Sequence, residues 1–269
     1  MRRFDATELR KTILTMAYSG ATVHIGCAFS IVEILAVLYR NHLRLDRDNP
    51  RAPLRDYMVL SKGHGVMAQY ACLHELGYVS QEEVRDYFGD GTRLKGLADV
   101  HVPGVEATCG SLGHGLSVAA GLALAARLNK TDQRIYVLVG DGELNEGPIW
   151  EAVMFAVHFK LDNLVIVVDK NGFQAMGSTD EVMRLGNIED KFSAFGCEAI
   201  AVDGHDEAAL DEAFMSCHQH MDERPKVIVA KTVKGKGVSF MENDNAWHYT
   251  RLKVDSYNAA MTELRERIA

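Results

Sequence analysis

Two short polar loops carry the residue types best suited to bind a metal ion, and each directly follows an apolar run. The first loop is GDG at residues 140–142, and the second is DKNGF at residues 169–173. Asp141 offers a carboxylate and Asn171 an amide oxygen, and a backbone carbonyl, waters and ligand phosphate oxygens would complete an octahedral Mg²⁺ site. Because so few protein ligands are on offer, the pattern predicts a phosphate-bearing ligand beside the metal ion.

The alternative interpretation is that both loops are ordinary turns, since GDG and Asn-Gly occur in many turns. The order of the expected elements argues against it. Residues 134–139 and 164–168 read as continuous apolar strands, with a helix between them at residues 147–159. Such a βαβ unit has a right-handed crossover, and ligands bind outside the carboxyl ends of its strands. We therefore expect the two loops side by side, with the amides at the start of the helix close to anionic oxygens.

The rest of the sequence alternates in the same way, which predicts an α/β fold with a mostly parallel sheet and helices on both faces. Asp5 with Glu8, and Ser30 with Glu33, have the spacing of capping boxes that open two helices. No linker rich in Pro, Gly or Ser interrupts the sequence, so residues 1–269 are expected to form a single domain. Further strands are expected at residues 57–60, 199–202 and 227–230, and further helices at residues 117–126, 207–220 and 254–267.

The composition disfavours several classes of partner. The sequence has 29 Lys and Arg against 37 Asp and Glu, a formal net charge of −8, which disfavours nucleic acid and anionic membranes. Five scattered cysteines without a C-x-x-C motif disfavour a disulfide framework or a zinc site, so the expected location is the reducing cytoplasm. The N-terminus does not read as a signal peptide, and no apolar run reaches the ~20 residues that span a bilayer.

Taken together, the motifs resemble the thiamine-diphosphate fingerprint, and the sequence is similar to transketolases through nearly its whole length. Asn171 lies 30 positions after Asp141, which is the spacing in that family. The resemblance implies the diphosphate domain of a thiamine-diphosphate-binding fold, with thiamine diphosphate and Mg²⁺ as cofactors. Further matching segments are residues 19–26 (SGATVHIG), 62–65 (KGHG), 103–115 (PGVEATCGSLGHG) and 247–248 (WH).

The resemblance also implies which residues bind the cofactors. The metal ligands would be Asp141, Asn171 and the backbone carbonyl of Phe173. Three residues would contact the diphosphate, namely His64, Gly142 and His248. Three others would line the thiazolium and aminopyrimidine region, namely Gly110, Ser111 and Leu112. The acidic residues of the GDG loop and behind it would complete the cofactor site, namely Glu143, Glu146 and Glu151.

His24 and His248 would, by the same resemblance, face the substrate and move protons on its hydroxyls. An imidazole suits this role because its pKa lies near neutrality. Any one of these histidines taken alone is more often a surface residue or a satisfied core residue. Their agreement in register with the other motifs favours the functional interpretation.

The sequence departs from the family at one position that matters for the substrate. Leu97 stands where transketolases usually have a substrate-facing histidine, and the nearby His101 is only a partial substitute. His114 replaces the glutamine of the family's GPLGQG segment, which is a smaller change. The change at Leu97 puts the usual sugar-phosphate substrate in question.

A second polypeptide is expected to complete the enzyme. In transketolases a second domain supplies the glutamate that acts on the aminopyrimidine ring and most groups that hold substrate phosphate. The sequence resembles the first domain, and the helix expected at residues 254–267 is too short for another α/β domain. We therefore expect a partner chain with the pyrimidine-binding and C-terminal domains, as in split transketolases, and an α₂β₂ heterotetramer.

The expected activity is transfer of a two-carbon ketol unit from a ketose, phosphorylated in the usual case, to an aldose. Another thiamine-diphosphate enzyme is an alternative: a 2-oxo acid decarboxylase or dehydrogenase, or a relative of deoxyxylulose phosphate synthase. A non-catalytic partner subunit is a further alternative. The KGHG turn, the PGVE segment and the Trp-His pair favour a transketolase. The intact Asp141, Asn171 and His64 argue against a decayed site.

Overall fold

The computed structural model describes residues 3–20, 23–219 and 222–266. Three parts of the sequence-based expectations lie outside these residues. They are Ala21 and Thr22 of the SGATVHIG segment, His220 of the expected helix at 207–220, and Arg267 of the expected C-terminal helix.

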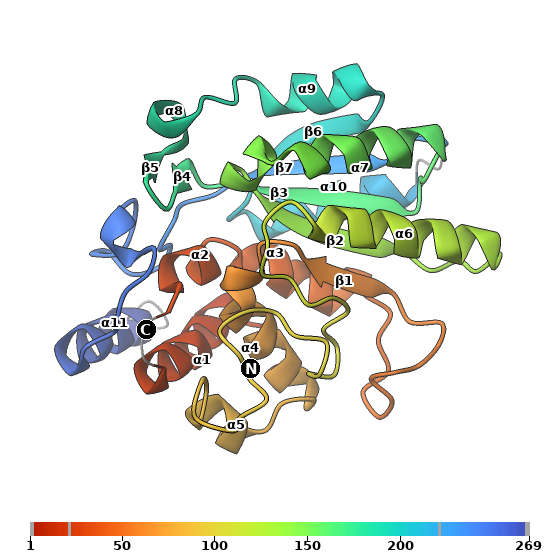
Figure 1. Ribbon diagram of the computed structural model, residues 1–269. Helices are drawn as coiled ribbons and strands as arrows, with labels where there is room; N and C mark the ends of the chain where they lie inside the picture. The colour runs from red at the N-terminus through yellow and green to blue at the C-terminus, as the bar shows by residue number, and fades with distance from the viewer. Residues whose placement is uncertain (1–2, 21–22, 220–221, 267–269) are drawn as a thin grey trace.

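A parallel sheet of five strands lies at the centre of the described chain (Figure 1). Its strands, in the spatial order β1-β2-β3-β7-β6, are β1 (Tyr57–Leu60), β2 (Ile135–Gly140), β3 (Leu164–Lys170), β7 (Lys226–Lys231) and β6 (Glu198–Asp203). Every neighbouring pair is parallel. β2 and β3 are buried almost throughout, because helices cover both faces of the sheet. All five strands predicted from the sequence are confirmed, with ends shifted by at most two residues.

The helices form a layer on each side of the sheet (Figure 1). On one side lie α6 (Gly115–Leu128), α7 (Gly147–His158) and α9 (Ile188–Phe195); on the other lie α1 (Ala6–Ser19), α2 (Ile25–Phe29), α3 (Val32–Val37) and α4 (Val66–Leu76). α10 (Glu207–Gln219) packs against α3 and β6, and α11 (Val254–Glu266) packs against α1. The helices predicted from residue 117 onward are confirmed to within two residues. Among the described residues, no helix combines the length and apolar character needed to cross a membrane.

Short elements complete the chain and shape the loops at the edge of the sheet. They are α5 (Gln81–Arg85), α8 (Thr179–Val182), a π turn η1 (Leu38–His42), the 3-10 turns η2 (Gly63–Gly65), η3 (Gly142–Asn145) and η4 (Asn245–Trp247), and the hairpin β4 (Phe173–Gln174) with β5 (Gly177–Ser178). The 3-10 turn η3 separates the GDG loop from α7. The helix expected behind that loop therefore begins one short turn later than the end of β2.

The two expected capping boxes have different outcomes. Asp5 caps α1, since its carboxylate accepts two backbone amides of the first turn. The box of Ser30 with Glu33 is wrong. The Ser30 hydroxyl donates to the Asp169 carboxylate at 2.8 Å, and Glu33 forms an ion pair with Arg10 at 2.6 Å. α3 is buried on every side, so its polar residues are bound to neighbouring elements rather than to its own first turn.

Candidate functional site

The GDG and DKNGF loops lie side by side because β2 and β3 are neighbouring parallel strands. Gly140 pairs with Asp169 in the register of the sheet. The amide of Asp141 donates to the carbonyl of Asp169 at 3.1 Å, and the amide of Gly172 donates to the Asp141 carboxylate at 2.6 Å. The adjacency predicted from the βαβ unit is therefore confirmed.

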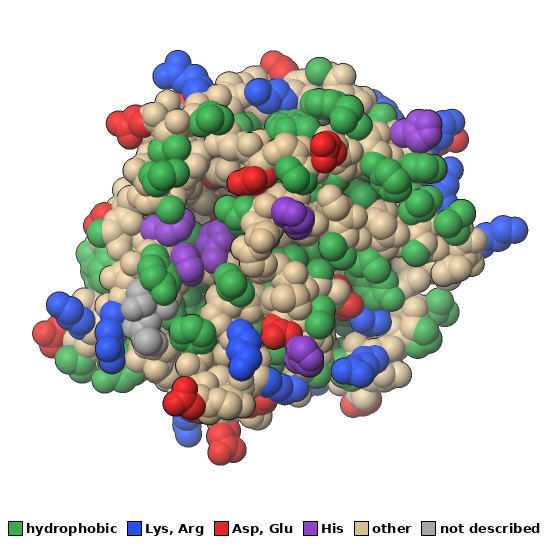
Figure 2. Space-filling model, viewed as in Figure 1, with side chains coloured by type: hydrophobic (Ala, Val, Ile, Leu, Met, Phe, Trp, Pro, Cys, Tyr) green, Lys and Arg blue, Asp and Glu red, His purple; other side chains and the backbone are tan. Residues whose placement is uncertain are grey.

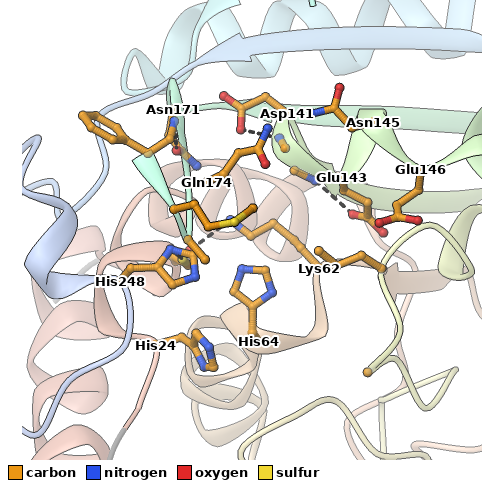
Figure 3. A pocket seen from close by; sticks show the side chains of 18 of the residues that line it. His24, Lys62, His64, Asp141, Glu143, Asn145, Glu146, Asn171, Gln174 and His248 are labelled. Carbon is orange, nitrogen blue, oxygen red and sulfur yellow. Dashed lines mark hydrogen bonds between the residues drawn. The ribbon is translucent and has the colours of Figure 1, made fainter. Parts of the chain in front are cut away.

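A cavity of about 440 Å³, called the main cavity below, lies at this edge of the sheet (Figure 3). Most residues expected to form the site line it, namely His24, His64, Gly110, Leu112, Asp141, Gly142, Glu143, Glu146, Asn171, Phe173 and His248. Ser111 and Glu151 do not line it. Ser111 is exposed, and Glu151 lines a separate cavity formed by α6 and α7. His101 is also exposed and pairs with Asp99, so it does not take the place of a histidine at Leu97.

Three imidazoles gather on the side of the cavity opposite Asp141 and Asn171 (Figure 3). The ring centroids of His24 and His64 are 5.1 Å apart, those of His24 and His248 5.5 Å, and those of His64 and His248 5.8 Å. Histidine side chains are visible together in a hollow of the molecular surface (Figure 2). Residues from three distant parts of the sequence therefore meet at one point.

All three imidazoles are neutral near pH 7. Burial, followed by the positive charge of Lys234, lowers the pKa of His24 to about 4 and that of His248 to about 3. Burial and the charge of Lys62 hold the pKa of His64 well below its ordinary value. The expected pKa near neutrality is therefore wrong for His24 and His248 in the free chain. A neutral imidazole can still accept a hydrogen bond from a substrate hydroxyl, but its lowered pKa makes it a weaker base than expected.

Two buried lysines make this side of the site electropositive. The ammonium group of Lys62 donates to the carbonyl of Cys27 at 3.2 Å and to the Asp169 carboxylate. The ammonium group of Lys234 lies 2.6 Å from Nδ1 of His248, and burial lowers its pKa. Two buried cations next to neutral imidazoles favour an anionic ligand.

Two adjacent buried carboxylates, Asp141 in the wall of the main cavity and Asp169 behind it, have different environments. Burial alone would raise the pKa of Asp169, but the charge of Lys62 and hydrogen bonds from Ser30, Thr232 and Asn171 outweigh it and lower that pKa. Asp141 accepts hydrogen bonds from the backbone amides of Gly142 at 2.8 Å and Gly172 at 2.6 Å. Burial and the negative charge of Asp169 raise the pKa of Asp141 to about 7.

The chemistry around Asp141 fits a hard divalent cation. A cation would offset the repulsion between the carboxylates of Asp141 and Asp169. The side-chain oxygen of Asn171 belongs to the loop beside Asp141, and an amide oxygen is a ligand for such a cation. That oxygen accepts the amide of Phe173 at 3.0 Å. A second group of possible metal ligands, Cys27 with His64 and His248, has ligand atoms within 4.8 Å of one another. The neighbouring lysines make that corner positive, so a cation is disfavoured there.

Two further observations fit a phosphate-bearing ligand. The side-chain nitrogen of Gln174 is buried, lines the main cavity, and has no hydrogen-bond partner in the described part of the chain. An unpartnered buried donor is satisfied by an anionic oxygen. A Cβ at Gly142 would lie 2.7 Å from Cγ of Gln174, so glycine keeps this part of the loop open. The residues present therefore fit a diphosphate with a bound Mg²⁺.

Glu143 has partners different from those expected of a cofactor-binding residue. Its carboxylate accepts the Ser61 hydroxyl at 2.5 Å and the backbone amides of Gly113 at 2.7 Å and Gly140 at 3.1 Å. These bonds join three loops that surround the main cavity. Glu143 thus holds the walls of the site in place through its carboxylate.

Sequence reasoning missed several residues of the main cavity and its surroundings. In the sequence, Lys62 stands out only as part of the KGHG segment, and Lys234 and Gln174 do not stand out at all. A lysine is normally exposed. Lys62 and Lys234, however, each stand in a loop that follows a strand of the sheet, β1 and β7. That position at the ligand-binding edge of the sheet is the signal by which the sequence could have pointed to them. Gln174 gave no such signal, since a glutamine in a turn is ordinary.

The raised pKa of Asp141 predicts how stability depends on pH without metal. The folded chain binds this proton more tightly than the unfolded chain, whose carboxyl has an ordinary pKa near 3.8. The resulting stability is fully present below pH 3.8 and is lost as the pH rises through about 7. We expect the Tm of the chelator-treated chain to fall by about 5 °C between pH 5 and pH 8.

Thermal unfolding across this pH range checks the expectation, with Asp141→Asn as the matched variant. The variant should lack this part of the pH dependence, and Mg²⁺ with thiamine diphosphate should reduce it in the wild-type chain. Identical pH profiles for the two proteins would show that Asp141 does not titrate with a raised pKa.

Comparisons with known proteins identify the class to which this fold and site belong. Residues 8–266 match the family described as transketolase, thiamine diphosphate binding domain. The chain is 40% identical over 260 residues to an apulose-4-phosphate transketolase subunit of Phocaeicola vulgatus, covering 96% of this chain and 92% of that protein. It is 39% identical over 265 residues to 6-deoxy-6-sulfo-D-fructose transketolase subunit SqwG of Clostridium sp. This match covers 97% of this chain and 95% of that protein.

A solved structure agrees with this assignment. The transketolase of Campylobacter jejuni superposes with a TM-score of 0.92 at 30% identity, covering 97% of this chain and 42% of that one. The fold is thus the diphosphate-binding α/β fold of thiamine-diphosphate enzymes. The chain belongs to the transketolase family, and the two relatives named above, which are of similar length, are transketolase subunits. The expected fold class and the expected type of enzyme are confirmed.

Proposed function

We propose that this chain holds the diphosphate and the Mg²⁺ ion of thiamine diphosphate in a transketolase that a second subunit completes. The enzyme transfers a two-carbon ketol unit from a ketose, phosphorylated in the usual case, to an aldose. The main cavity carries the proposal, because the Asp141 and Asn171 oxygens line one side of it, and Lys62 and three histidines line the other. Lys62 is paired with Asp169, and Lys234 lies behind His248. This separation of charge suits a diphosphate with a hard cation on one face.

The cation would be held by the Asp141 carboxylate, the side-chain oxygen of Asn171 and the backbone carbonyl of Phe173. The diphosphate would lie between this cation and the basic side of the main cavity. There His64, His248 and the amide of Gly142 are the expected contacts. Lys62 and the unpartnered Gln174 nitrogen add donors that sequence reasoning did not supply, and Lys234 adds positive charge behind His248.

The rings of the cofactor would lie along the segment that runs from Gly110 through Ser111 to Leu112. Thiamine diphosphate, when bound, supplies the carbon centre that carries the ketol unit. The chain itself moves protons: His24 and His248, neutral at pH 7, are placed to accept a proton from a substrate hydroxyl. Glu143 acts indirectly, by tying the loops at Ser61 and Gly113 to the GDG loop.

A second subunit with the pyrimidine-binding and C-terminal domains is part of the proposal. Relatives of similar length are named as subunits of transketolases, which supports a partner. The exposed face of α6 and α7 is apolar, with Val118, Met154 and Phe155 each more than a third exposed. Glu151 lies on the same face beside Phe155, and Glu146 stands at the start of α7. We propose that the partner covers it, that residues 1–269 act as one domain, and that an α₂β₂ heterotetramer forms in the cytoplasm.

The test is a ketol-transfer assay on the chain co-purified with its second subunit, with calorimetry of cofactor binding. Thiamine diphosphate should bind tightly in the presence of Mg²⁺ and at least about tenfold more weakly with a chelator. Ketoses should serve as donors, and 2-oxo acids without a ketol unit should not. Cofactor binding without any ketol transfer, or a preference for decarboxylating simple 2-oxo acids, would contradict the proposal.

A further inference from the structure

Asp169, near the end of β3, is a fully buried carboxylate behind the wall of the main cavity. The ammonium group of Lys62 donates to its Oδ2 at 2.5 Å, and the Ser30 hydroxyl donates to the same oxygen at 2.8 Å. The side-chain amide of Asn171 also donates to Oδ2 at 2.8 Å, and the Thr232 hydroxyl donates to Oδ1. A carboxylate has about four positions that accept donors, so these contacts leave Asp169 none for a metal ion.

The donors to Asp169 come from parts of the sequence that are far apart. Ser30 lies between α2 and α3, Lys62 follows β1, and Thr232 follows β7. Ser30 and Lys62 are themselves buried, so the carboxylate cannot turn without leaving buried donors unpaired, which is costly. Asp169 is therefore a fixed anchor for its remaining donor, Asn171.

The side-chain amide of Asn171 has a donor end and an acceptor end, and only the acceptor end can bind a cation. Its Nδ2 donates to Asp169, and its Oδ1 accepts the backbone amide of Phe173 at 3.0 Å. Both contacts select the same orientation of the amide. Asn171 lines the main cavity, so its oxygen remains the end that is offered to a cation beside Asp141.

The charge of Asp169 is balanced by Lys62. The two form an ion pair at 2.5 Å, and their side chains are 0% and 2% exposed, respectively. Asp141, in contrast, forms no ion pair with any residue that the structure describes, and it accepts the backbone amides of Gly142 and Gly172. Asp141 is thus left to attract the cation, while Asp169 contributes a fixed geometry.

We propose that Asp169 is the positioning residue of the metal site: it binds no cation itself and holds the Asn171 amide with its oxygen toward the cation. This inference rests on the proposed function, in which Asn171 is a metal ligand. An amide at position 169 could accept from Lys62 and Ser30 through its oxygen, and would then present its own NH₂ group to Asn171. The Asn171 amide would turn over to meet it, and would offer the cation a donor in place of an acceptor.

The test measures Mn²⁺ binding by electron paramagnetic resonance in the complex with the second subunit and thiamine diphosphate, with thermal unfolding as a check of the fold. Asp169→Asn should weaken Mn²⁺ binding by ~10–100-fold, as expected for a residue that orients a metal ligand. Asp132→Asn removes a carboxylate from the surface and should leave Mn²⁺ binding unchanged. An Asp169 variant that folds and binds Mn²⁺ as tightly as the wild-type complex would overturn the inference.

Exchanging the two side chains separates positioning from a merely structural role. Asn171→Asp alone places two acceptors against each other, and adding Asp169→Asn restores one donor facing one acceptor. The double variant should therefore bind Mn²⁺ at least about tenfold more tightly than Asn171→Asp alone, whereas independent structural defects would add. Equal or weaker binding by the double variant would overturn the inference, even if the single Asp169 variant does not fold. Unchanged Mn²⁺ binding in Asp141→Asn would instead count against the metal site of the proposed function.

Discussion

Replacing Asp141 by asparagine is expected to weaken Mg²⁺-dependent binding of thiamine diphosphate by at least about 100-fold. The Asp141 carboxylate is 2% exposed and lies beside the paired Asp169, so it is the carboxylate free to bind a cation. Asparagine keeps the shape but removes the charge that a hard cation needs. Loss of a residue that merely supports a metal ligand costs ~10–100-fold in affinity, and loss of the ligand itself should cost more.

Calorimetry with and without a chelator measures this effect, and Asp132→Asn is the matched control. Asp132 is a surface carboxylate with a side chain that is 82% exposed, so its substitution should leave cofactor affinity unchanged. Cooperative thermal unfolding of the Asp141 variant would show that the fold persists. If that variant bound thiamine diphosphate in Mg²⁺ as tightly as the wild-type chain, the metal assignment would have to be abandoned.

The sheet could be predicted from the sequence because its strands are buried on both faces. Residues 134–139 and 164–168 are continuous apolar runs, and such runs have few alternatives to a central parallel strand. The position of the loops then follows, since parallel strands end at the same edge. This is why the βαβ unit correctly predicts that the loops of Asp141 and Asn171 lie side by side.

The environment of each side chain could not be predicted in the same way. Ser30 with Glu33 has the spacing of a capping box, yet tertiary contacts with Asp169 and Arg10 override that local preference. Glu143 was expected to contact the cofactor, but its carboxylate is taken up by three donors from three loops. Such partners come from distant parts of the sequence, and spacing carries no information about them.

The free chain is expected to show no detectable ketol transfer, and addition of the second subunit is expected to restore it, a change of at least about 1000-fold. In the proposed function, the main cavity holds the metal ion, the diphosphate and the hydroxyls of the substrate. Within the described residues, every carboxylate that lines it lies on the GDG loop or directly behind it. We therefore propose that the partner supplies the glutamate that acts on the aminopyrimidine ring in transketolases. A titration of the free chain with the second subunit, followed by initial rates, measures this dependence.

The dependence of activity on the second subunit can also be tested by substitutions in this chain, on the apolar face of α6 and α7. Phe155 is 37% exposed there, and Met215 on α10 is 42% exposed on a helix that packs against the opposite layer. Phe155→Glu would bury an unpaired charge if the partner covers the face, so it should weaken the complex and the activity together by about 100-fold. Met215→Glu adds the same charge outside the face and should change neither. Full activity of the free chain would remove the need for a partner, and full activity of the Phe155 variant in the complex would place the partner on another surface.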